Sequence, residues 1–206
     1  MLIKNIIFDF GGVIINIDHK RTEDAFKNLG IIDFESMYSK VAQTQLFDLL
    51  ETGRISQGIF VQEIQKLLPV SEEKIINAWN SIIMDLPEHR IRLLEETRKH
   101  YHTFLLSNSN KIHYDLYVAD LKSNFGYEDF TGLFEKVYFS FQVGMRKPDA
   151  EIFELVIDEN QLDPKETLFI DDSFQHIDGA KKCGLQTYFL KQEEDITDLF
   201  EKGILK

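Results

Sequence analysis

Five short apolar runs stand at wide intervals along the chain, each bounded by polar residues or glycine. They are IIF (6–8), FLL (104–106), VYF (137–139), LFI (168–170) and YFL (188–190). Continuous apolar runs of this length are typical of parallel strands that are buried on both faces. Helical patterns separate them, so the order of elements predicts an α/β fold in which helices cover both faces of a parallel sheet.

The segment between the first two runs is much longer than one crossover requires, and it is rich in helical patterns. Its two clearest amphipathic stretches place Ile59, Phe60, Ile64, Leu67 and Leu68 on one face, and Ile75, Ile76, Trp79, Ile82 and Ile83 on another. Ser71 is the predicted N-cap of the second stretch. We therefore predict a helical lobe over residues 17–86, inserted into a core formed by residues 1–16 and 87–206, with a helix over 88–100 returning to the sheet.

Polar residues follow three of the apolar runs directly. Asp9 follows the first, Ser107 and Asn108 follow the second, and Asp171 and Asp172 follow the fourth. In open α/β sheets, ligands bind outside the carboxyl ends of the strands. We therefore expect these side chains to converge on one site.

The segment GMRKPD (144–149) adds a basic residue to this predicted site. Pro148 suits the first turn of a helix that continues through Ile152, Phe153, Val156 and Ile157. Lys147 would then lie at a helix N-terminus, where backbone N–H groups already favour an anion.

Three carboxylates in one pocket would repel one another unless a cation neutralised them. Asp9, Asp171 and Asp172 offer only oxygen ligands, which suit Mg²⁺ bridged to a substrate phosphate. Ser107 and Lys147 would supply a hydroxyl donor and a positive charge to the phosphate oxygens. Taken singly each residue is equally well explained as a turn or a helix cap, but matched positions at successive strand ends favour a site.

Composition narrows the possible partners. The net charge of −12 makes nucleic acid and anionic membrane surfaces unfavourable partners. Cys183 is the single cysteine, which excludes an intrachain disulfide and a cysteine-based metal centre. The N-terminal apolar run is short and interrupted by Asp9, unlike a signal peptide, so we expect a cytoplasmic protein.

Four segments together resemble the motifs of the haloacid dehalogenase-like superfamily of hydrolases. They are FDFGGV with Asp9, LLSNS with Ser107, MRKPD with Lys147, and FIDDS with Asp171 and Asp172. The resemblance covers the whole chain, and ETGRIS (51–56) is similar to a recurrent segment of the family's C1 cap. The nearer likeness is to the bacterial α-D-glucose-1-phosphate phosphatase type and to the phosphatase domain of soluble epoxide hydrolases.

This resemblance implies a Rossmann-like three-layer core with a C1 cap and a Mg²⁺-dependent phosphatase activity on a small phosphorylated metabolite, with sugar phosphates among the candidates. It implies that Asp9 is the nucleophile and forms an aspartyl-phosphate, with Lys147 as a further catalytic residue. The implied metal ligands are Asp9, the Gly11 carbonyl, Asp171 and Asp172, and the implied phosphate-binding residues are Ser107, Asn108 and Lys147.

The chain departs from the family pattern at Gly11, where most members carry a second aspartate that acts as general acid and base. Loss of that acid removes proton delivery to the leaving oxygen, which is normally worth about 10²–10⁴-fold in rate. Three outcomes stay open: substrates with good leaving groups, a substitute acid such as Asp18 or His19, or weak or absent catalysis. Asp18 is equally explained as a solvated residue at the hinge of the lobe.

Two alternative functions follow from the same residues. A 2-haloacid dehalogenase needs no leaving-group acid and so is compatible with Gly11, but that branch usually lacks the fourth-motif acids. A non-catalytic phosphate-binding protein is the second alternative. We expect a monomer or a weak homodimer, and His113 is a secondary candidate for the pocket lining.

Overall fold

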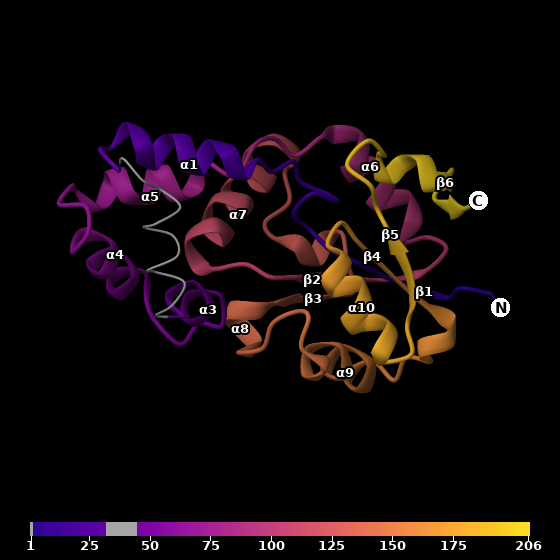
Figure 1. The fold of residues 1–206 in the computed structure, drawn as a ribbon. Coiled ribbons are helices and arrows are strands. Elements are labelled where there is room, and N and C mark those ends of the chain that lie inside the picture. The colour runs from indigo at the N-terminus through magenta and orange to yellow at the C-terminus, as the bar shows by residue number, and fades with distance from the viewer. Residues whose placement is uncertain (1, 32–44) are drawn as a thin grey trace.

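The computed structural model describes residues 2–31 and 45–206, and a parallel five-stranded sheet forms its centre (Figure 1). The strands are β1 (Asn5–Phe8), β2 (His102–Ser107), β3 (Lys136–Phe139), β4 (Thr167–Asp171) and β5 (Gln186–Phe189). Their order across the sheet is β3-β2-β1-β4-β5, so the first strand is central. All five predicted strands and the parallel α/β architecture are confirmed.

Strand register brings the polar strand ends together. Phe8 at the end of β1 is level with Leu105 in β2 and with Ile170 in β4. The backbone N–H of Asp9 then donates to the Ile170 carbonyl at 2.9 Å. Asp9 therefore leaves the sheet beside the end of β4, where Asp171 stands.

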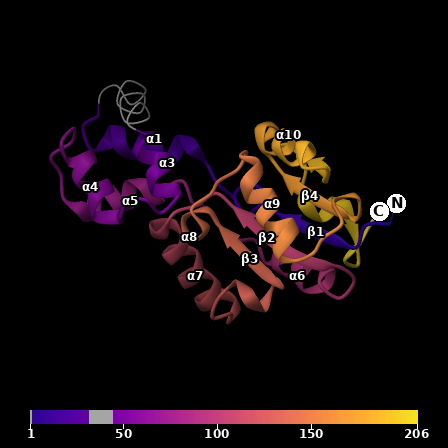
Figure 2. The same ribbon diagram turned by 90° about the horizontal axis from the view of Figure 1, so that it is seen from below.

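Helices cover both faces of the sheet (Figure 2). Helices α6 (Glu88–Thr97) and α7 (Lys111–Phe125) pack on one face, and α9 (Ala150–Glu159) and α10 (Phe174–Lys182) pack on the other. Successive strand residues point to opposite faces. Accordingly, Phe8 belongs to the buried cluster that contains Leu94 and Leu121, whereas Ile7 belongs to the cluster of Phe153 and Ile177.

Three local predictions about the core are wrong. Strand β5 lies at the sheet edge and is not buried on both faces, and Phe189 is 40% exposed. Pro148 precedes Asp149, the N-cap of α9, so it lies outside the helix rather than in its first turn. Helix α6 ends at Thr97, three residues before the predicted end.

The inserted segment forms helices around a hydrophobic cluster of its own. The described helices are α1 (His19–Asn28), α3 (Leu46–Glu51), α4 (Gln57–Gln65) and α5 (Glu72–Asn80). Their buried residues include Phe26, Leu50, Phe60, Ile64 and Ile75, and Ile112 of α7 joins them from the core. These helices lie at the end of the molecule opposite both termini (Figure 1). We call them the cap, whose exact limits at 17 and 86 stay a prediction and whose residues 32–44 lie outside the described part.

The predicted apolar faces of the cap helices need correction. Ile59 and Leu67 are 46% and 47% exposed, whereas Val61 is buried. The buried face of α4 is thus narrower than predicted, and Leu67 follows the end of the helix at Gln65. Ser71 is the N-cap residue of α5, as predicted, but that helix ends at Asn80. Ile82 and Ile83 therefore lie beyond it, and Ile83 forms an antiparallel bridge with Ile17.

The remaining elements are short. Helix α8 (Ser140–Val143) follows β3, and β6 (Phe200–Glu201) pairs with β7 (Ile204–Leu205) in an antiparallel hairpin near the C-terminus. Within the described residues, every helix is too short or too polar to cross a lipid bilayer.

Candidate active site

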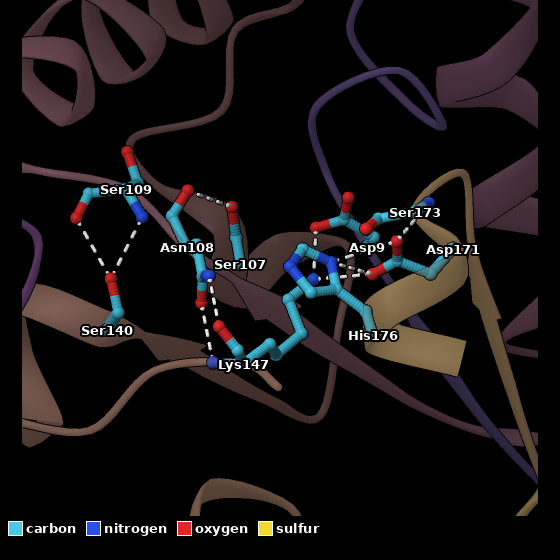
Figure 3. Close-up of polar contacts among 9 residues, drawn as sticks. All are labelled: Asp9, Ser107, Asn108, Ser109, Ser140, Lys147, Asp171, Ser173 and His176. Carbon is cyan, nitrogen blue, oxygen red and sulfur yellow. Dashed lines mark hydrogen bonds and ion pairs between the residues drawn. The ribbon is translucent and has the colours of Figure 1, made fainter. Parts of the chain in front are cut away.

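The strand ends hold a buried cluster of opposite charges (Figure 3). Nζ of Lys147 lies 2.7 Å from Oδ1 of Asp9 and 2.7 Å from Oδ2 of Asp171. The side chains of Lys147 and Asp171 are fully buried, and that of Asp9 is 9% exposed. Two carboxylates thus share one ammonium group in a setting where an unpaired charge would be very costly.

Burial and pairing compete in setting the ionisation of this cluster. Burial disfavours the charged form of Lys147, but Asp171 and Asp9 outweigh it and raise the pKa of the lysine. Burial also opposes ionisation of Asp171, yet Lys147 and His176 hold its pKa below the usual range. Asp9 differs, because burial together with the Asp171 charge outweighs Lys147 and raises its pKa to about 7. The cluster therefore carries more negative charge than one lysine can neutralise.

His176 is a part of this site that the sequence analysis missed. Its Nδ1 lies 3.0 Å from each carboxylate oxygen of Asp171, and the Ser173 N–H donates to Oδ1 of the same group at 2.7 Å (Figure 3). The available signal was spacing, because His176 stands five residues after Asp171 in the first turn of α10. These contacts orient Asp171 from the helix side.

The three acidic residues fit the predicted metal. One oxygen from each of Asp9, Asp171 and Asp172 lies within 4.8 Å of the other two. Asp172 also presses against the main chain at Gly12, where an added Cβ would lie 2.0 Å from Oδ2. Gly12 has φ +76°, a conformation that glycine adopts freely. A compact set of carboxylate oxygens with excess negative charge suits Mg²⁺, whereas the Gly11 carbonyl as a ligand stays a prediction.

Asn108 holds Lys147 in place. Its amide nitrogen donates to the Lys147 carbonyl at 2.8 Å, and the Lys147 N–H donates to its Oδ1 at 2.9 Å. Beside it, the Ser109 N–H donates to the Ser140 hydroxyl at 2.9 Å, and that hydroxyl donates to the Ser109 carbonyl at 3.0 Å (Figure 3). Both groups of the Asn108 side chain are therefore occupied by Lys147, and a phosphate contact of Asn108 stays a prediction.

A cavity of about 240 Å³ opens next to the charged cluster, between the core and the cap. Its core wall contains Gly11, Ser107, Asn108, Ser109 and Asn110. Its cap wall contains His19, Thr22, Phe47, Glu51, Trp79 and Ile82, and α7 adds His113 and Tyr117. A small substrate in this cavity would touch both lobes of the protein.

Aromatic rings line the cap side of the cavity. Phe47 stacks on Trp79 with 5.3 Å between ring centroids, and His113 stacks on Trp79 at 5.4 Å. Nε2 of His113 donates to the Trp79 carbonyl at 3.2 Å, because a carbonyl can only accept. Burial lowers the pKa of His113 to about 4. His113 therefore does line the pocket, as a neutral ring that ties α7 to the cap.

The two substitute acids predicted from sequence lie in different places. Asp18 is the N-cap of α1, and its Oδ1 accepts from the Lys20 N–H at 2.9 Å. Among the described residues it does not belong to the cavity wall, whereas His19 does. Gly11 also lines the cavity, and a Cβ added there would meet Ile17 at an ordinary 3.4 Å. The absence of a side chain at Gly11 is therefore not forced by lack of space.

Glu51 is the second site residue that the sequence analysis missed. It ends α3 and lines the cavity opposite the strand ends. Burial outweighs the opposing effect of Lys147 and raises its pKa to about 7. The segment ETGRIS drew attention to this region, but the cap helices could not be oriented against the core from sequence.

Comparison with known proteins adds three findings. A model of the haloacid dehalogenase-like hydrolase family matches residues 3–184. The chain is 34% identical over 189 residues to a D-ribitol-5-phosphate phosphatase of Bacteroides thetaiotaomicron, and the match covers 91% of each protein. Solved structures of the same family are also similar to this chain over nearly its whole length, among them the following two.

The first is a haloacid dehalogenase family enzyme from Bacteroides thetaiotaomicron, solved in complex with magnesium and inorganic phosphate. It is 36% identical with a TM-score of 0.87, and the match covers 97% of this chain and all of that one. The second is a predicted hydrolase of the family from Porphyromonas gingivalis, which is 31% identical with a TM-score of 0.83 over 94% of each chain.

Proposed function

The chain belongs to the haloacid dehalogenase-like hydrolases, and on that premise we propose that it is a Mg²⁺-dependent phosphatase of small phosphorylated metabolites, with sugar and polyol phosphates as its substrate class. The observation that carries the proposal is the buried group formed by Asp9, Lys147 and Asp171, with 2.7 Å between the lysine and each carboxylate. The similar phosphatase and the magnesium–phosphate complex support the same reaction class.

In the proposed reaction, a carboxylate oxygen of Asp9 attacks phosphorus and the bond to the ester oxygen breaks. Lys147 favours the ionised form of Asp9 and aims it, and its charge would also act on the incoming phosphate oxygens. Water then attacks the aspartyl-phosphate, which releases inorganic phosphate and restores the Asp9 carboxylate.

Asp9, Asp171 and Asp172 would hold Mg²⁺, and the bound cation would neutralise charge on the carboxylates and on the phosphoryl group. His176 and Ser173 fix the rotamer of Asp171 through their hydrogen bonds. Ser107 is 2% exposed and borders the cavity, and its hydroxyl, which donates to the Asn108 carbonyl at 3.4 Å, would donate to a phosphate oxygen when substrate is bound.

The retained acidic group favours this function over halide release from 2-haloacids. Attack on carbon needs no metal, so a dehalogenase would gain nothing from Asp171 and Asp172 beside Asp9. A bound cation would offset the repulsion among the three carboxylates and favour the ionised form of Asp9. A non-catalytic phosphate-binding protein would share this geometry. Only a measurement of turnover distinguishes it from a phosphatase.

A substrate panel with and without Mg²⁺ tests the proposal. D-ribitol 5-phosphate and related sugar and polyol phosphates are incubated with the protein, and released phosphate is measured. We expect Mg²⁺-dependent release that falls to background in Asp9→Asn. Equal release by that variant would remove Asp9 as nucleophile, and Mg²⁺-dependent phosphate binding without turnover of any ester would leave only the binding function.

Assembly and location stay predictions. A monomer or a weak homodimer would elute accordingly from a calibrated size-exclusion column over a range of concentrations. A cytoplasmic location would place the protein in the soluble fraction of gently lysed cells of its own organism.

A further inference from the structure

The leaving oxygen of the substrate lacks an acid on the core side of the site, because Gly11 carries no side chain. Among the residues that the structure describes, four titratable groups line the cavity from other elements: His19, Glu51, His113 and Tyr117. An alkyl alcohol leaves poorly without a proton, so we expect one of these groups to be the proton donor.

Two of the four groups are poor donors. The Nε2–H of His113 already donates to the Trp79 carbonyl, and burial lowers the pKa of the ring to about 4. Burial raises the pKa of the Tyr117 phenol above its usual range, and the charges of Asp9 and Glu51 raise it further. Tyr117 is therefore too weak an acid for this task near neutral pH.

We propose that Glu51, at the end of cap helix α3, is the proton donor to the leaving-group oxygen and replaces the acid that is missing at Gly11. This inference rests on the proposed phosphatase function. Its geometry is that of a carboxyl group from the cap facing Gly11, Ser107 and Asn108 across one small cavity.

Glu51 pairs with Arg146 through one carboxyl oxygen. Its Oε2 is fully buried and makes no hydrogen bond within the described part of the chain, although Nη2 of Arg146 lies 3.1 Å away. Arg146 also pairs with Asp48, so its charge is divided between two carboxylates of α3. Glu51 is thus held near the site without being fixed in a strong bidentate ion pair.

Opposing effects set the ionisation of Glu51. Within the described residues, Arg146 pairs with Glu51, Lys147 acts on it through its charge, and Asp48 shares Arg146 from the same helix. Tyr117 and His113 from α7 and His19 from α1 line the same cavity. Burial outweighs the opposing charge of Lys147 and raises the Glu51 pKa to about 7, so a large fraction is protonated at neutral pH. A bound phosphate would add negative charge nearby and favour the protonated form further.

The two chemical steps balance with Glu51 as acid and then base. When Asp9 attacks phosphorus, the ester P–O bond breaks, and the departing oxygen takes both the bonding electrons and the Glu51 proton. The products are the free alcohol, the aspartyl-phosphate and the Glu51 carboxylate. In the second step that carboxylate takes a proton from the attacking water, so inorganic phosphate, the Asp9 carboxylate and protonated Glu51 are restored.

The test compares esters that differ in their need for a proton. Values of kcat/KM are measured for p-nitrophenyl phosphate, phenyl phosphate and D-ribitol 5-phosphate in the wild type and in Glu51→Gln. We expect a loss of about 10²–10⁴-fold for the alkyl ester, less for phenyl phosphate, and less than about 10-fold for p-nitrophenyl phosphate. Equal losses for all three esters, or a rise in KM alone, would overturn the donor role.

Two further variants extend the test. Asp48→Asn leaves Arg146 to pair with Glu51 alone, which favours the Glu51 carboxylate, so it should lower kcat/KM for the alkyl ester in the same direction as Glu51→Gln but by less. His19→Gln tests the remaining acid of the cavity wall, and a selective loss with that variant in place of Glu51→Gln would transfer the role to His19.

A rescue variant separates chemistry from structure. Gly11 has room for a side chain, so Gly11→Asp in the Glu51→Gln background should restore the alkyl ester more than the p-nitrophenyl ester. Rescue of all esters to the same extent, or of none while circular dichroism shows a folded protein, would count against the proposal.

The wild type gives an independent readout if Glu51→Gln fails to fold. Because the donor must be protonated, kcat/KM for the alkyl ester relative to kcat/KM for p-nitrophenyl phosphate should fall as pH rises through about 7, and the ionisation of Asp9 affects both esters alike and cancels in this ratio. Identical pH profiles would contradict the role. Hydrolysis that does not depend on Asp9 would instead show that the proposed function itself fails.

Discussion

The two walls of the cavity are built in different ways. On the core wall, Lys147 is fully buried and each of its contacts with Asp9 and Asp171 measures 2.7 Å, while Asn108 fixes its backbone. On the cap wall, the stacked rings of Phe47 and Trp79 line the cavity together with Glu51, whose Oε2 faces Arg146 and makes no hydrogen bond in the described residues. The core wall fixes its charged side chains by short contacts, whereas the cap wall carries the carboxyl group that we propose as the proton donor.

This difference explains why the walls tolerate different changes. A buried charge that loses its partner is strongly destabilising, whereas a partly exposed ion pair contributes little. Adjacent residues offer a direct comparison, because Lys147 serves the core wall and Arg146, with a side chain 29% exposed, serves the cap wall.

The largest expected effect concerns this pair. Lys147→Met should lower the free energy of unfolding by about 3–5 kcal/mol, because Asp9 and Asp171 lose their shared cation. Arg146→Met should cost less than about 1 kcal/mol. Urea unfolding measures both values. Mg²⁺ should restore part of the loss in the lysine variant, since a cation that binds the native state stabilises it. Equal losses in the two variants would show that the Lys147 contacts contribute no more to stability than the Arg146 ion pairs.

The next effect is an acid sensitivity on the cap wall. His113 titrates with a pKa of about 4 in the folded protein, against 6.5 for an unperturbed histidine. The unfolded chain therefore binds a proton between these values while the native state does not, so stability falls as pH drops through this window. The difference amounts to roughly 3 kcal/mol.

His113→Gln removes that contribution. Urea unfolding at pH 7 and pH 4 should show that the wild type loses roughly 3 kcal/mol more than the variant over this range. Glutamine can still donate to the Trp79 carbonyl, so it is the appropriate replacement. The same pH dependence in wild type and variant would mean that His113 has the same pKa in the folded and unfolded states.

The smallest expected effect separates neighbouring glycines. Gly12→Ala would place a Cβ 2.0 Å from Oδ2 of Asp172 at a left-handed φ, whereas Gly11→Ala would meet Ile17 at 3.4 Å. Displacement of Asp172 should weaken Mg²⁺ binding about 10–100-fold in the first variant, with little change in the second. Titration calorimetry with Mg²⁺ provides the test, and similar affinities in the two variants would remove Asp172 from the metal site.

The same contrast determines what could be predicted from sequence. The core wall was predictable because apolar runs locate the strands, and parallel register then brings Asp9, Ser107 and Asp171 to one edge. Short-range spacing could also have identified His176, which follows Asp171 by five residues. His176 lies just beyond the acidic motif, so the motif alone does not predict its role.

The cap wall could not be predicted in this way. The position of Glu51 depends on how α3 packs against the core, through the pairing of Asp48 and Glu51 with Arg146, which stands 98 residues beyond Asp48. Helical periodicity shows which face of a helix is apolar, but not which lobe that face contacts. Even the apolar faces were only partly correct, as exposed Ile59 and Leu67 show.

The proposed phosphoryl transfer through Asp9 on the core wall passes through a covalent intermediate, and this intermediate can be trapped. The protein is mixed with D-ribitol 5-phosphate and Mg²⁺, quenched in acid within milliseconds, and digested for peptide mass spectrometry. We predict one phosphoryl group on the carboxyl group of Asp9, formed in the wild type and absent from Asp9→Asn. Turnover with no phosphorylated carboxyl group, or a phosphoryl group on another residue, would show that Asp9 is not the nucleophile.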